Sequence, residues 1–177
     1  MIYRHISKTF LMLALSMFCS FLATIIIIKK TSIANFGLFS LLKSLLPLLS
    51  VIALLGIDKA YIKKFSNKEP ENVNYYLVIF ITILSIFISY ICVSIYDIHE
   101  YYFFVLLGII TGSINFFLTS YFRLKNKYFL AQFILAGHKI IFFILIIYFL
   151  YFDYLLSDYR LIIFLCLSYL IPSSFYF

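Results

Sequence analysis

The chain has 177 residues, of which 65% are hydrophobic and 12% are charged, and its net charge is +7. Soluble domains average about 45–50% apolar and about 25% charged residues, so this chain cannot cover itself with polar surface. The composition excludes a soluble globular domain. The positive charge does not indicate nucleic acid as a partner either, because that inference requires a basic surface on a soluble fold.

The sequence predicts an all-α membrane protein in which residues 1–177 form one domain of six transmembrane helices. About 20 apolar residues at 1.5 Å rise cross a hydrocarbon core of about 30 Å. The first apolar run is longer than the apolar region of a signal peptide and ends in Lys29 and Lys30, so we expect it to be a true span. Apolar runs separated by short charged breaks place the spans at residues 10–28, 34–57, 74–96, 102–122, 128–152 and 161–177.

The charged breaks predict that the N-terminus lies in the cytoplasm, because cytoplasmic loops carry an excess of Lys and Arg. With this orientation, three basic residues lie outside: Lys29, Lys30 and Arg160. Nine lie on the cytoplasmic side: Arg4, Lys8, Lys59, Lys63, Lys64, Lys68, Arg123, Lys125 and Lys127. One helix more or fewer between the two basic loops would put them on opposite sides, so the charge bias agrees with six spans.

Two lysines, Lys43 and Lys139, lie near the middle of predicted spans. A charge at the bilayer centre costs on the order of 3 kcal/mol, and both lysines are too far from their helix ends to reach the interface readily. Each lysine faces a hydrated cavity, or it belongs to a buried structural pair, or its span boundary is misplaced. On the first reading, we expect a cationic cavity that includes Lys43, Lys139, Ser40, Asn115 and Gln132.

Small polar residues recur at three- and four-residue spacing in four of the first five spans, which places them on one face of each helix. Such faces either pack against other helices or line a cavity, and Gly108 with Gly112 matches the GxxxG packing pattern. Pro47, one turn beyond Lys43, is expected to kink its helix and free a carbonyl. His138 points about 100° away from Lys139, so the two need not line the same surface. We favour an interior hydrogen-bonded histidine over a proton relay.

The chain shows no pattern typical of an enzyme, a cofactor site or a metal site. All seven acidic residues lie in breaks or at span ends, and no nucleophile has a base nearby. Cys19, Cys92 and Cys166 lie far apart within apolar segments and lack metal-ligand spacing. We therefore expect no catalytic residues, no cofactor and no metal.

Two short stretches resemble the Wzx-type polysaccharide flippases of the multidrug/oligosaccharidyl-lipid/polysaccharide exporter superfamily. The start of the second span and the loop after it match at Phe36, Gly37, Ser40, Gly56, Ile57, Asp58, Ala60, Lys63 and Phe65. The basic loop after the fourth span matches at Arg123, Lys127 and Tyr128. Elsewhere the resemblance extends to hydropathy and loop placement.

The resemblance implies the N-terminal lobe of a transporter in the bacterial cytoplasmic membrane. Its substrate would be undecaprenyl-pyrophosphate-linked oligosaccharide, an O-antigen or capsule repeat unit, held by a cationic cavity to which Lys43 and Lys139 correspond by position. The family has twelve to fourteen spans, so we expect a fragment, a truncated gene product, or a half-transporter that pairs with a C-terminal lobe or a second copy. The alternatives are a drug or small-metabolite exporter of the same superfamily and a nonfunctional or structural membrane fragment.

Overall fold

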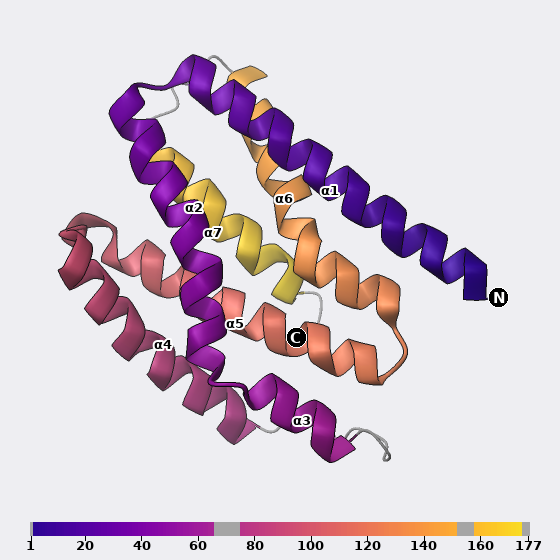
Figure 1. The fold of residues 1–177 in the computed structure, drawn as a ribbon. Coiled ribbons are helices and arrows are strands. Elements are labelled where there is room, and N and C mark those ends of the chain that lie inside the picture. The colour runs from indigo at the N-terminus through magenta and orange to yellow at the C-terminus, as the bar shows by residue number, and fades with distance from the viewer. Residues whose placement is uncertain (1, 66–74, 152–157, 175–177) are drawn as a thin grey trace.

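The computed structural model describes residues 2–65, 75–151 and 158–174, and every regular element in these ranges is a helix (Figure 1). The longer helices follow the apolar runs of the sequence, since a helix satisfies all its backbone polar groups internally. The elements in chain order are α1 (Ile2–Lys30), α2 (Ile33–Leu54), α3 (Ile57–Phe65), α4 (Tyr75–Tyr96), the 3-10 turn η1 (His99–Tyr101), α5 (Tyr102–Leu124), α6 (Tyr128–Tyr151) and α7 (Asp158–Ser174).

Five of these helices are long and apolar enough to cross a membrane: α1, α2, α4, α5 with η1, and α6. They correspond to the first five predicted spans. The sixth predicted span, residues 161–177, corresponds to α7, whose apolar part Tyr159–Pro172 is shorter than a full span. The chain is therefore a multi-pass helical protein with five candidate spans, and six spans are not confirmed.

The break after the second span contains an additional helix, α3, which the sequence analysis did not predict. The second span also ends at Leu54 rather than at residue 57. The chain turns there because Leu55 and Gly56 have φ angles of 46° and 77°, in the left-handed region that ends helices. Figure 1 shows α3 leaving the end of α2 in a new direction.

Helix α5 forms the centre of the bundle and packs against α2, α3, α4, α6 and α7. Of its most apolar stretch, 61% is buried, against 28% to 33% for the other four candidate spans. Helix α1 packs along α6 and makes few contacts with α2, so these two consecutive helices diverge from their shared turn (Figure 1). The outer faces of α1, α2, α4 and α6 are apolar and exposed, as expected for surfaces that meet lipid.

Small residues bring α2 and α5 into close contact, as the GxxxG pattern predicted. A Cβ added at Gly112 would lie 3.0 Å from Ser50 Cβ and closer still to its Oγ. A Cβ at Gly108 would lie 3.0 Å from a Leu46 methyl carbon. The Ser113 hydroxyl donates a 3.0 Å hydrogen bond to the Ser50 carbonyl, which adds a polar link between the two helices.

Candidate functional site

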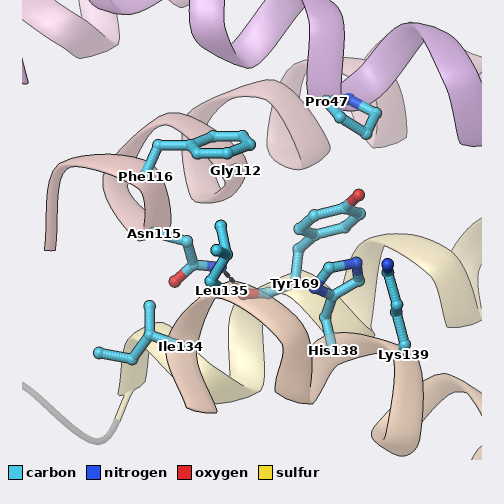
Figure 2. Close-up of a pocket in the computed structure, with 9 residues that line it drawn as sticks. All are labelled: Pro47, Gly112, Asn115, Phe116, Ile134, Leu135, His138, Lys139 and Tyr169. Carbon is cyan, nitrogen blue, oxygen red and sulfur yellow. Dashed lines mark hydrogen bonds between the residues drawn. The ribbon is translucent and has the colours of Figure 1, made fainter. Parts of the chain in front are cut away.

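A cavity of about 200 Å³ opens between α2, α5, α6 and α7 (Figure 2). Its walls are mainly apolar or aromatic and carry the polar groups of Asn115, His138, Lys139 and Tyr169, which is the usual composition of a binding pocket. Helix α2 contributes Pro47, and α7 contributes Tyr169. The remaining lining residues come from α5 and α6: Gly112, Asn115, Phe116, Ile134, Leu135, His138 and Lys139.

Asn115 is 4% exposed and is only half satisfied by hydrogen bonds. Its Nδ2 donates a 2.7 Å hydrogen bond to the backbone carbonyl of Tyr169, which fixes the orientation of the amide (Figure 2). Its Oδ1 has no hydrogen-bond partner in the described part of the chain. A buried acceptor without a partner costs about 1–3 kcal/mol, so the pocket favours a ligand that brings a donor.

His138 and Tyr169 form the aromatic wall of the pocket. Their ring centroids are 4.3 Å apart and their planes differ by 16°, so the rings are stacked. In Figure 2, His138 and Lys139 both project from α6 toward the cavity. The 100° between neighbouring helical positions had suggested that they need not share a surface, but one pocket covers both.

Lys139 lies midway along α6 and lines the pocket, whereas Lys43 lies midway along α2, one turn before Pro47. The Lys43 ammonium donates a 2.9 Å hydrogen bond to Thr24 Oγ1 on α1 and sits 5.7 Å from the centre of the Phe39 ring. The two helices meet close to these lysines, where Phe39, one turn before Lys43, stacks on Phe142, about one turn after Lys139, with ring centroids 5.5 Å apart.

Within the described ranges, neither lysine forms a salt bridge; the ion pair found there joins Asp97 to His99, where α4 gives way to η1. The described acidic residues lie at element ends, in α3 or near η1, away from the middle of the bundle. Among the described residues, no carboxylate is therefore in place to form a buried ion pair with either lysine. The two mid-helix lysines concentrate positive charge at one level of the bundle.

The structure places the other predicted site residues differently. Asn115 and Lys139 line the pocket together, but Ser40 and Gln132 do not. Ser40 is exposed, because α2 buries the face that carries Phe39, Leu42 and Leu46. Gln132 is half-buried near the start of α6, two residues before Ile134, which lines the pocket. The structure thus brings Asn115 and Lys139 together in the pocket. Lys43 lies nearby, one turn of α2 before the pocket residue Pro47.

Most serine and threonine stripes serve helix packing rather than the pocket. Ser85 on α4 is fully buried and donates to the Ile81 carbonyl of its own helix. Ser16 on α1 and Ser168 on α7 do the same with carbonyls of their helices. A hydroxyl satisfied in this way can be buried between helices at little cost.

Helix α2 continues as a helix through Pro47, which has no N–H to donate to the Lys43 carbonyl.

Two pocket residues, His138 and Tyr169, were not among the predicted site residues. The signal for His138 was present, since a titratable residue inside a span is a functional candidate. Tyr169 carried no signal, because it is one of 16 tyrosines in the chain. In the described ranges, no three His, Cys, Asp or Glu side chains gather as metal ligands.

The helices and the pocket define a multi-pass membrane protein with a cationic, partly polar cavity inside its bundle. Comparison of the chain with protein-family models, with curated proteins and with solved structures finds no match. The chemistry of the pocket and of the two lysines is therefore the basis for assigning a function.

Proposed function

We propose that this bundle is part of a flippase that moves undecaprenyl-pyrophosphate-linked oligosaccharide across the bacterial cytoplasmic membrane. One observation carries the proposal: Lys43 and Lys139 both lie at mid-helix, each within about one turn of the stacked Phe39 and Phe142 rings that join α2 to α6, and no carboxylate lies beside either lysine in the described structure. Burying two like charges is costly. An anion bound between them offsets both the repulsion and the loss of hydration.

A lipid pyrophosphate matches these two lysines in charge. It carries about two negative charges, and each close ion pair gains about 4 kcal/mol at 4 Å with an effective dielectric of 20. The ammonium groups act as point charges, which suits a phosphate that must enter and leave rather than bind permanently. The isoprenoid tail stays in the bilayer, beside the exposed apolar faces of α1 and α2.

The pocket beside Lys139 suits the first sugar of the oligosaccharide. The apolar walls can meet the C–H face of the ring. Asn115 Oδ1 is covered and unpaired in the described structure, so a ligand that displaces the side chains over it would gain a hydrogen bond from a sugar hydroxyl to this oxygen. A volume of about 200 Å³ is below the roughly 300–1,000 Å³ of drug-sized sites, so the pocket would admit a single ring. The rest of the oligosaccharide would extend beyond it.

Alternating access requires a second bundle that moves against this one. We propose that the partner is a C-terminal lobe or a second copy of the chain, and that the N-terminus lies in the cytoplasm. The excess of Lys and Arg on the side that carries α3 and the α5–α6 turn supports this orientation. A drug exporter for cations is less favoured, because such a cavity would need acidic groups where this bundle carries lysines.

The substrate class is tested by native mass spectrometry of the purified chain in detergent. The probes are undecaprenyl pyrophosphate, the uncharged undecaprenol with the same tail, and the lipophilic cation tetraphenylphosphonium. We expect at least tenfold tighter binding of the pyrophosphate than of the alcohol, and no saturable binding of the cation. Equal binding of the two lipids, or saturable binding of the cation alone, would overturn the proposal.

A further inference from the structure

Six exposed basic side chains gather at one end of the bundle, although they come from two separate segments. Helix α3 contributes three of them, and the end of α5 with the turn to α6 contributes the others. We call this set the basic end: Lys59, Lys63, Lys64, Arg123, Lys125 and Lys127. Asp58 is the one acidic residue in α3. Among the described residues, basic side chains therefore far outnumber acidic ones at the basic end.

An aromatic cluster brings the two basic segments together. Tyr61 of α3 lies with its ring centroid 5.2 Å from that of Phe117 and 6.4 Å from that of Tyr121, both on α5. Phe65, at the end of α3, is buried beside Tyr61 with the centroids 4.7 Å apart. These contacts hold α3 against the C-terminal half of α5, so the lysines of α3 cannot swing away from the bundle.

Two ammonium groups rest on rings of this aromatic cluster, one from each segment. Lys64 Nζ lies 5.1 Å from the centroid of Phe65, and Lys125 Nζ lies 4.5 Å from the centroid of Tyr121. A cation over a ring is attracted to it but keeps most of its donors free. Lys64 and Lys125 are therefore positioned without being neutralised.

The direction of the chain places this charge at the membrane surface. The left-handed turn at Leu55 and Gly56 ends the span of α2, and α3 then continues as a short helix with one packed face and one basic face. Such a helix is typical of the interface between headgroups and acyl chains. The opposite end of the bundle differs, because Lys29 and Lys30 share it with Asp97 and Glu100 of the η1 region.

We propose that the basic end binds the phosphate headgroups of anionic membrane lipids such as phosphatidylglycerol. Exposed basic residues beside a membrane attract anionic lipid, and each contributes severalfold to the local preference. Because the aromatic cluster holds α3 against α5, the basic side chains of the two segments lie closer together than charges scattered along a free loop would. This inference is independent of the proposed transport function, because it uses surface charges outside the spans and not Lys43 or Lys139.

The absence of Trp from the chain allows a direct test. Y128W places a single tryptophan, which can be excited selectively over the tyrosines, directly after Lys127 of the basic end, at a tyrosine that is 52% exposed. I33W places one at the opposite end, at an isoleucine that is 93% exposed. Each protein is reconstituted into bilayers of phosphatidylcholine and phosphatidylglycerol, with bromine on the acyl chains of either lipid as a quencher. The ratio of quenching by the two brominated lipids reports the local lipid composition.

We expect brominated phosphatidylglycerol to quench Y128W at least about twofold more than its bulk fraction predicts. The same lipid should show a clearly smaller enrichment in the quenching of I33W. Changing Lys59, Lys64, Lys125 and Lys127 together to Gln should remove the preference at Y128W, whereas changing the same four to Arg should keep it. Circular dichroism confirms that the variants remain helical. Equal ratios at the two positions, or a preference that survives the change to Gln, would overturn the proposal.

Discussion

The Lys43 ammonium donates a 2.9 Å hydrogen bond to Thr24 Oγ1 and so joins α2 to α1 at mid-helix. Helix α1 otherwise packs on α6, the helix that carries Lys139, and makes few contacts with α2. Helix α1 therefore contacts the helix of Lys139 along its length and the side chain of Lys43 through Thr24. We infer that this bond holds Lys43 in place while no anion is bound, since a charged donor in lipid needs an acceptor.

Removing this acceptor should loosen the contact between α1 and α2. T24V keeps the shape of the side chain but deprives Lys43 of its partner, so we expect a loss of about 1 kcal/mol in the free energy of unfolding. Unfolding in detergent, followed by circular dichroism, measures the change. T31V is the control, because the Thr31 hydroxyl, just past the end of α1, donates back to the Ile27 carbonyl of α1 and not to another helix. A loss of similar size in both variants would contradict the role given to Thr24.

The contact between α2 and α5 should be intolerant of an added methyl group at Gly112. G112A places a Cβ against Ser50, and we expect destabilisation of about 2 kcal/mol or more as the two helices are pushed apart. G37A is the control on α2, where nothing lies within 4 Å of an added Cβ. That variant should be neutral or slightly stabilising, because Ala is a better helix former than Gly. Thermal unfolding of the purified proteins distinguishes the two outcomes.

The pocket should sense the sugar rather than the pyrophosphate. N115L removes both the free Oδ1 and the hydrogen bond to the Tyr169 carbonyl. We expect it to weaken binding of undecaprenyl pyrophosphate carrying one sugar by about tenfold, and to leave binding of the sugar-free lipid within about twofold. Native mass spectrometry with the two lipids measures both constants. An equal loss for both lipids would indicate a structural role for Asn115 and no sugar contact.

Hydropathy predicted the five long helices because each depends on a single property, a run of apolar residues long enough to cross lipid. It missed α3, whose nine residues are too few and too polar to stand out as a span. The signal for α3 lies instead in the four-residue spacing of Ile57, Tyr61 and Phe65, which forms its packed face. The end of α2 was misplaced because the left-handed turn at Leu55 and Gly56 lies inside the apolar run.

The candidate site was harder to predict, because a polar stripe shows which residues share a face but not what covers that face. Ser40 shares a stripe with Lys43 in sequence, yet it is exposed in the described structure. Ser50, from the same stripe, is buried against α5. The convergence of Asn115 with His138 and Tyr169 depends on three helices meeting, and spacing within one helix cannot reveal that.

The most direct test of the account is whether Lys43 and Lys139 together confer preference for an anionic lipid. K43Q/K139Q removes both charges but keeps polar side chains, and K29Q/K30Q removes two exposed charges at the end of α1. We expect the first variant to bind undecaprenyl pyrophosphate no better than undecaprenol, and the second to retain the preference of the unmodified chain. An unchanged preference in a correctly folded K43Q/K139Q protein would contradict the account.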